Sequence, residues 1–162
     1  LNETLTGSIA TQNVSRTLFG TQGRIAATDT LDVAAGRDVA VRGAAVSAGG
    51  SAALDAGRDI DIGTVILSDR RGTVNAGEHL ATTSESHFGS ALASGRDLAM
   101  TAGRDATLTA AQVRADGALS VVAGGNVTIG AAEDRSTFSF RGSGARWSAQ
   151  GTADTRSVVG SS

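Results

Sequence analysis

Short runs in which apolar and polar residues alternate recur along the chain at a nearly constant interval. A Gly-Arg-Asp opening followed by an apolar residue stands at Gly36, Gly57 and Gly103, and weaker forms of it stand at Gly77 and Gly124. Successive openings are 21, 20, 26 and 21 residues apart. A period of this length is typical of a solenoid, in which each unit buries its apolar face only against its neighbours.

Each unit holds three short apolar–polar pieces. The first supplies aligned pairs of residues, namely Val39 with Val41, Ile60 with Ile62, Leu80 with Thr82, Ala106 with Leu108, and Val127 with Ile129. The second supplies Ile25, Val46, Leu67 and Val113, and the third supplies residues 31–35, 52–56, 74–76, 98–102 and 119–123. Alternation with a period of two is that of a β-strand, and no segment shows the 3.6-residue spacing of a helix.

The pattern therefore predicts an all-β fold, a right-handed parallel β-helix with about 21 residues and three short strands per coil. The chain length allows about six or seven coils, stacked ~4.8 Å apart. The third position of each opening reads Asp38, Asp59, His79, Asp105 and Asn126. Asp and Asn side chains at such corners are expected to bond backbone amides two residues further on. We expect the neighbouring arginines to offset the repulsion between stacked carboxylates, and these are Arg37, Arg58 and Arg104.

Composition narrows the classes of function. Aromatic residues make up 3% of the chain, which suits the narrow interior of a coil. The absence of cysteine excludes disulfides, thiolate metal sites and thiol nucleophiles. Fourteen basic residues, all arginine, are interleaved with sixteen acids for a net charge of −2, so no one-sided basic face favours nucleic-acid binding. The chain shows no signal peptide or long apolar run and starts at Leu1, so we expect an internal fragment whose open ends are covered by flanking coils.

One elongated domain is expected over residues 1–162, made of an irregular or partial coil (1–23), regular coils (24–130), an excursion (131–157) and the start of a further coil (158–162). Leu18 precedes Val39 by 21 residues, so the ladder is expected to reach Leu18. The unit that Gly77 opens is five or six residues too long, and the surplus is assigned to an insertion at 83–94. Residues 136–140 and 145–149 are expected to pair as a hairpin across the glycine-rich turn 142–144.

Two groups of residues are candidates for binding a partner. Insertions in solenoids often form the binding face, and the expected insertion contains His87 and Phe88. A lone histidine in a polar loop is more often simply solvated, and no second histidine or acid cluster stands at metal-ligand spacing. The second group lies in the excursion and combines aromatic rings with arginines: Phe138, Phe140, Arg141, Arg146 and Trp147. These aromatics either grip a partner or sugar, or cover the coil beneath them.

The motifs together resemble the haemagglutinin repeats of filamentous haemagglutinin-type exoproteins. The resemblance is carried by the Ala-Gly-Arg-Asp elements at 35–39, 56–60 and 102–106 and by residues 108–113. Residues 131–134, followed by a Ser/Gly-rich stretch and residues 159–162, resemble the second class of these repeats, which occurs in effector proteins of contact-dependent growth inhibition. The resemblance covers roughly residues 30–162, and it departs from the pattern at Gly77, Glu78 and His79.

The resemblance implies a large Gram-negative protein, exported by an outer-membrane two-partner-secretion transporter and displayed as a β-helical filament. Such proteins act as adhesins toward a target-cell receptor or glycan, or carry a C-terminal toxin to another cell. The leading hypothesis is therefore a non-catalytic structural or adhesive segment without cofactors. A glycan- or receptor-binding module is the alternative. A polysaccharide-cleaving enzyme is a weaker one, because Asp38, Asp59 and Asp105 occur once per coil and so indicate corner structure.

Overall fold

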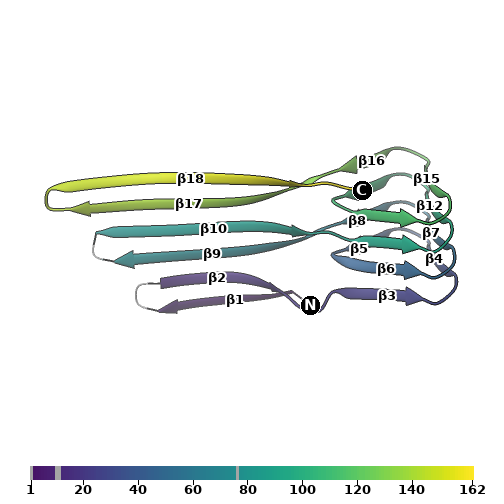
Figure 1. The fold of residues 1–162 in the computed structure, drawn as a ribbon, viewed down its shortest axis with the longest axis horizontal. Helices are drawn as coiled ribbons and strands as arrows, with labels where there is room; N and C mark the ends of the chain where they lie inside the picture. The colour runs from purple at the N-terminus through teal and green to yellow at the C-terminus, as the bar shows by residue number, and fades with distance from the viewer. Residues whose placement is uncertain (1, 10–11, 76) are drawn as a thin grey trace. The chain divides into compact units, whose positions relative to one another are not determined.

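The computed structural model describes residues 2–9, 12–75 and 77–162. Its contacts divide the chain into two interleaved compact units rather than the one elongated domain expected from the period. The coil unit comprises Gln22–Val65, Phe88–Ala132 and Val159–Ser162, and the hairpin unit comprises Leu1–Thr21, Ile66–His87 and Glu133–Val158. All regular structure in the described residues is β-strand (Figure 1).

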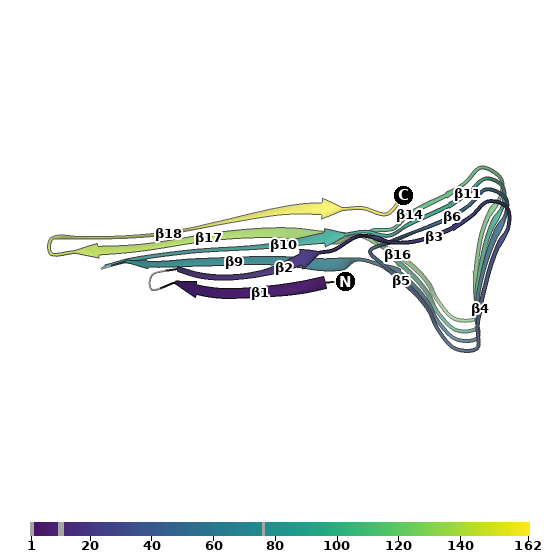
Figure 2. The same cartoon turned by 90° about the horizontal axis from the view of Figure 1, so that it is seen from below.

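The coil unit winds through four complete coils of three strands each. The first two coils contain β3 (Gly23–Ala27), β4 (Leu31–Ala35) and β5 (Val39–Arg42), then β6 (Ala44–Ala48), β7 (Ala52–Ala56) and β8 (Ile60–Gly63). The last two contain β11 (Ala91–Ser94), β12 (Leu98–Ala102) and β13 (Ala106–Thr109), then β14 (Gln112–Ala115), β15 (Leu119–Ala123) and β16 (Val127–Gly130). Strands at the same position in successive coils pair with one another and form three four-stranded parallel sheets. In Figure 2 the coils lie one behind another, so the strands of each sheet nearly overlap.

The predicted column of apolar residues is confirmed within this unit. Val39 pairs with Ile60, Ile60 with Ala106, and Ala106 with Val127, all in parallel register. The second column runs Ile25, Val46, Leu92 and Val113. The chain is therefore a parallel β-helix, with four coils in place of the six or seven that its length suggested.

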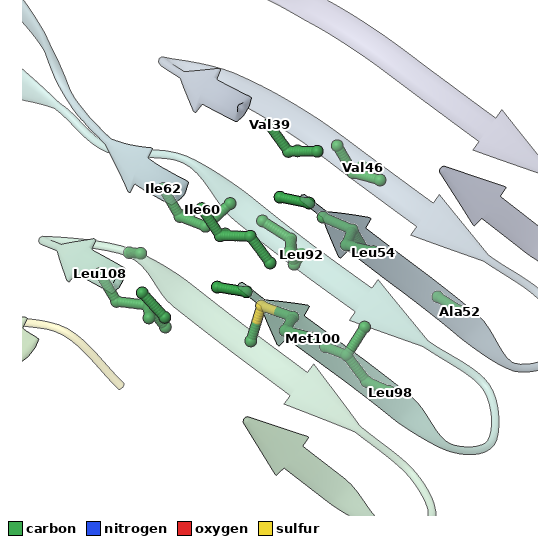
Figure 3. Close-up of a cluster of buried hydrophobic side chains, with 14 of the residues drawn as sticks. Val39, Val46, Ala52, Leu54, Ile60, Ile62, Leu92, Leu98, Met100 and Leu108 are labelled. Atoms are coloured by element: carbon green, nitrogen blue, oxygen red, sulfur yellow. The ribbon is translucent and has the colours of Figure 1, made fainter. Parts of the chain in front are cut away.

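Aliphatic side chains fill the interior of the two central coils. Leu54, Ile60 and Leu98 are each 1% exposed and Ile62 is fully buried (Figure 3). Period-two alternation turns these residues inward while their neighbours, such as Asp55, face solvent. Burial weakens at the outer coil, where Ile129 is 66% exposed because no further coil covers β16 in the described residues.

The hairpin unit is a six-stranded antiparallel sheet. Its strands are β1 (Asn2–Ile9), β2 (Gln12–Phe19), β9 (Val65–Asn75), β10 (Glu78–Phe88), β17 (Ala132–Gly144) and β18 (Trp147–Val159), and they lie side by side in chain order. Two seams join successive hairpins. In the first, β2 pairs with β9, with Arg16 opposite Asp69. In the second, β10 pairs with β17, with Leu80 opposite Phe140.

The placement of the insertion at 83–94 was wrong. Gly57 and Gly103 stack in neighbouring coils although 46 residues separate them, so the intervals of 20 and 26 residues do not mark two coils. They mark one coil of ordinary length and one complete hairpin. Leu67, Val74 and Leu80 therefore lie in β9 and β10 instead of in the coil ladder, and Ala76 lies outside the described residues. Gly77 was aligned with the glycines of the coil corners, but it lies in the hairpin turn between β9 and β10, where its φ of 85° favours glycine.

Two further expectations differ from the structure. Residues 1–23 were predicted to be irregular or part of a coil, but β1 and β2 form a hairpin there, so Leu18 lies outside the ladder. A hairpin near the C-terminus was predicted correctly, but its turn is at residues 145–146 and not at 142–144. After this hairpin the chain returns to the coil unit, where Ser162 donates to the carbonyl of Ala111 and accepts from the amide of Val113.

Candidate functional site

One corner of the β-helix takes two different forms, and the hairpins originate there. Between the first and second coils the corner is short, because β5 ends at Arg42 and β6 begins at Ala44. Only Gly43 lies between β5 and β6, whereas residues 64–90 lie between β8 and β11. The corner from the third to the fourth coil is short again, with Ala110 at φ 46° in place of Gly43 at φ 57°. A hairpin is therefore inserted at this corner after every second coil.

A serine closes the corner where the second and third hairpins return to the coil unit. Ser90 is 2% exposed, and its hydroxyl lies 2.7 Å from the carbonyl oxygen of Gly63 and 3.0 Å from that of Val41. Ser161 occupies the matching position after β18, where its hydroxyl donates to Gly130 at 2.6 Å and accepts from the amide of Ala111 at 3.2 Å. Each hydroxyl thus adds a side-chain hydrogen bond to a carbonyl oxygen that also accepts from a backbone amide, Gly63 from Gly43 at 3.4 Å and Gly130 from Ala110 at 3.0 Å.

Sequence reasoning missed these serines. The signal is an apolar residue followed by Gly-Ser, which occurs as residues 88–90 and again as residues 159–161. Glycine is required in the first of these, because a Cβ at Gly89 would collide with the carbonyl oxygen of Ala110. The triplet therefore marks the return of a hairpin to the coil unit.

A ladder of Arg–Asp pairs runs along another corner of the coil unit. Arg58 donates through Nε to Asp38 at 2.8 Å, and Arg104 donates in the same way to Asp59 at 2.8 Å. These two arginines offset the carboxylates as predicted. The carboxylates do not bond amides two residues on, however. Asp105 accepts from the amide of Asn126 in the next coil at 2.9 Å, and Asp38 and Asp59 make longer bonds of the same kind.

The Arg–Asp pairs shift the pKa values of both partners so that the charged forms are favoured. The hydrogen bond from Arg58 holds the pKa of Asp38 below its usual value, and the hydrogen bond from Arg104 does the same to the pKa of Asp59. In return these carboxylates raise the pKa of both arginines. The Gly-Arg-Asp signature is thereby accounted for as structure, since each carboxylate links one coil to the next.

The five candidate residues of the predicted excursion lie in the last hairpin. Phe138, Phe140 and Arg141 are on β17, Arg146 is in the turn, and Trp147 begins β18. Trp147 is 52% exposed and Phe138 is 43% exposed. Arg141 and Arg146 make no ion pair in the part of the chain that the structure describes. By contrast, Arg135 in the same hairpin pairs with Asp154 at 3.0 Å.

A glycine brings two of these aromatic rings together. A Cβ placed on Gly142 would lie 2.8 Å from Cη2 of Trp147 and 2.9 Å from Cζ of Phe140. On Gly144 it would lie 2.5 Å from the indole Nε1. The two rings thus share the space above a bare stretch of backbone. We call these five residues of the last hairpin the aromatic tip (Phe138, Phe140, Arg141, Arg146 and Trp147). It combines an exposed indole with two arginines that form no ion pair among the described residues.

The other two candidates do not join the aromatic tip. His87 lies at the far end of β10, where Asp134 of β17 accepts from its backbone amide at 2.6 Å and lies 3.2 Å from its Nδ1. Its role there is to fasten one hairpin to the next. Phe88 belongs to the coil unit and is 38% exposed beside the corner that Gly89 and Ser90 form. The sequence grouped His87 with Phe88 in one insertion, whereas the structure places these two residues in different units.

The described residues contain no group of three or more His, Cys, Asp or Glu side chains that could hold a metal ion. They contain no helix long and apolar enough to cross a membrane either.

Comparison with known proteins identifies the repeat. Residues 4–66 and 69–149 each match the Hemagglutinin repeat family. The two matches follow the structural duplication, because equivalent coil residues such as Val39 and Ala106 are 67 residues apart. No curated protein matches the chain, and no solved structure does.

Proposed function

The chain belongs to the hemagglutinin repeat family, and we propose that it is a non-catalytic structural and adhesive segment of a large secreted protein on the surface of a Gram-negative cell. The observation that carries this proposal is the duplication. Each repeat supplies one hairpin and two coils, and no carboxylate of the Arg–Asp ladder is left over for chemistry. A unit that is built by stacking serves length and display.

The resemblance to filamentous haemagglutinin-type exoproteins gives the proposal its cellular setting. An outer-membrane two-partner-secretion transporter would export the chain, and flanking coils would cover the open ends of the β-helix. Coil-by-coil stacking suits such export, because each coil contacts only its neighbours and no disulfide has to form. The whole protein would then act by contact with a target cell, either as an adhesin or as the carrier of a C-terminal toxin.

Excision of one complete repeat tests the structural part of this proposal. Removing residues 23–89 joins Gln22 to Ser90, which occupies the coil position of Gly23. In the parent protein this variant should still be exported and labelled by antibody on intact cells. A control that removes residues 33–89 joins Asp32, inside β4, directly to Ser90, so it breaks the coil register and should abolish export. Export of neither variant, or surface labelling of both, would contradict the proposal.

The aromatic tip supports a second function, the binding of a glycan or receptor. Exposed aromatic rings with neighbouring guanidinium groups are enriched where proteins bind partners. Trp147→Ala should weaken the attachment of the purified chain to target cells by about tenfold or more, since a Trp anchor is commonly worth at least ~2 kcal/mol. Val122→Ala, at an exposed coil residue, is the matched control. Equal attachment by both variants would remove this function.

A further inference from the structure

A hollow of about 610 Å³ lies in the hairpin sheet where the second and third hairpins meet. The two hairpins differ in length there, because β9 and β10 have 11 residues each whereas β17 and β18 have 13 (Figure 1). The turn of the second hairpin ends beside β17, where Ser143 donates its amide to the carbonyl of Gly77 at 2.7 Å. The third hairpin continues beyond this point and forms a step in the sheet.

Strand pairing decides which side chains share the face of the sheet that holds the hollow. Arg141 stands directly opposite His79, so both side chains lie on one face with their Cβ atoms about 5 Å apart. The aromatic rings lie on the other face, since a Cβ on Gly142 would lie against both Phe140 and Trp147. Successive residues of a strand alternate between faces, so Arg141 faces away from both rings.

The lining of the hollow is polar and rich in hydrogen-bond donors. Its polar side chains come from the adjacent strands β10, β17 and β18, and they are His79, Arg141, Ser143, Ser148 and Gln150. None of these side chains makes an ion pair or a hydrogen bond with another residue that the structure describes. The described lining contains no aspartate or glutamate, so the guanidinium of Arg141 keeps its five N–H donors for a ligand.

The combination of one cation with neutral polar groups indicates the class of ligand. A guanidinium binds a carboxylate through two parallel hydrogen bonds. Ser and Gln side chains both donate and accept, as the hydroxyl groups of a sugar require. A ligand with many sulfate or phosphate groups would need several cations, whereas Arg141 is the only arginine among the described lining residues.

We propose that this hollow binds a carboxylated sugar. Arg141 holds the carboxylate, and the polar side chains of β17 and β18 bond the ring hydroxyls. Neighbouring strands lie ~4.8 Å apart, so the three strands place all these groups within about 10 Å of one another. This site extends the proposed glycan-binding function to the face away from Trp147, and it does not rest on the aromatic rings.

Amide chemical shifts of the intact, isotope-labelled chain test the proposal. The probes are the methyl glycosides of glucuronic acid and of sialic acid, which distinguish two sources of the same chemistry. At least one should shift the amides that surround the hollow in a saturable way, with a Kd on the order of 1 mM for so small a ligand. Methyl glucoside, which lacks the carboxylate, and acetate, which lacks the ring, should bind about tenfold more weakly or less. No saturable shift with either acidic sugar overturns the proposal, and so does equal binding of acetate or sulfate.

Matched variants make the outcome specific to the hollow. Arg141→Gln should weaken binding by about tenfold or more, and Arg141→Lys, which keeps the charge without the planar fork, should restore only part of it. Ser148→Ala is a second test and should weaken binding by about threefold. The control is Arg70→Gln, because Arg70 is an exposed arginine of β9 that forms no ion pair among the described residues and does not line the hollow. Binding that persists in both the Arg141→Gln and the Ser148→Ala variants, or an equal loss in the control, overturns the proposal. Because these titrations measure the sugar alone, their failure is distinct from an unchanged cell attachment of Trp147→Ala.

Discussion

The two units of this chain are stabilised in different ways. Every buried hydrophobic side chain that the structure describes belongs to the coil unit, in which Leu54, Leu98 and Met100 are each 1% exposed. The hairpin unit is a single layer of strands held by backbone hydrogen bonds and by cross-strand pairs such as Arg135 with Asp154. The coil unit therefore carries the hydrophobic contribution to the free energy of folding, and the hairpin unit carries the exposed surface.

The duplication is visible within each unit taken by itself. Each repeat adds two strands to every parallel sheet of the coil unit and two strands to the antiparallel sheet of the hairpin unit. Neighbouring strands in either kind of sheet lie ~4.8 Å apart, so each sheet grows by about 10 Å per repeat.

The largest contrast is expected from truncating one leucine in each unit. Leu54→Ala should lower the free energy of unfolding by about 2–5 kcal/mol, because it leaves a cavity in a closed aliphatic core. Leu80→Ala should cost less than ~1 kcal/mol, because that side chain is 39% exposed on the hairpin sheet. Denaturant unfolding measures both. Equal losses would mean that the hairpin sheet has a core of its own.

The junction serine should matter almost as much as a core residue. Ser90→Ala removes a buried hydroxyl that lies within hydrogen-bond distance of the carbonyl oxygens of Gly63 and Val41, at a cost of about 1–3 kcal/mol. Ser120→Ala, on an exposed face of β15, is the control and should change stability little. If the two variants unfold at the same denaturant concentration, the serine is not what closes the corner.

A smaller effect is expected where the short corner requires positive φ. Gly43→Ala should cost about 1–2 kcal/mol, since the residue sits at φ 57° in the left-handed region. Gly151→Ala in β18 is the matched control, because nothing lies within 4 Å of the added methyl group. Thermal unfolding compares them. Ala110 shows that the corner accepts a Cβ at this cost, so complete unfolding of the Gly43 variant would contradict the assignment.

The smallest effect concerns pH and is confined to acid. Arg58 and Arg104 hold the pKa values of Asp38 and Asp59 below their usual value in the folded state. The stability from the Arg–Asp ladder is therefore present above the unfolded-state pKa of about 3.9 and is lost as pH falls through the lower folded values. Melting temperature should decline below pH about 4, and less steeply in Asp59→Asn. A decline that is identical in this variant would exclude the ladder as its cause.

The sequence predicted the coil unit well because stacking repeats its chemistry. Val39, Ile60 and Val127 could be aligned from their distance to a glycine opening, and the structure confirms that column. The hairpins were harder to recognise, because the insertion at residues 64–89 is close to one coil in length and Gly77 falls near the expected corner. Period-two alternation is also common to coil strands and hairpin strands, so it could not separate them.

The candidate site shows the same limit. Aromatic and arginine content pointed to the aromatic tip, and its residues do lie together in one hairpin. Nothing in the pattern showed that Phe140 and Trp147 meet over Gly142, because that contact depends on the position of the turn. His87 was grouped with Phe88 by sequence proximity, although the two belong to different units.

The central claim is that hairpins are insertions at a corner that one residue can close. Replacing residues 64–89 by a single glycine, as at Gly43, should leave amide exchange in β6, β7, β11 and β12 unchanged. The control replaces residues 74–99, an equal number, and removes β11 together with the start of β12, so protection of that coil should be lost. Loss of protection in the first variant, comparable to that in the control, would contradict the account.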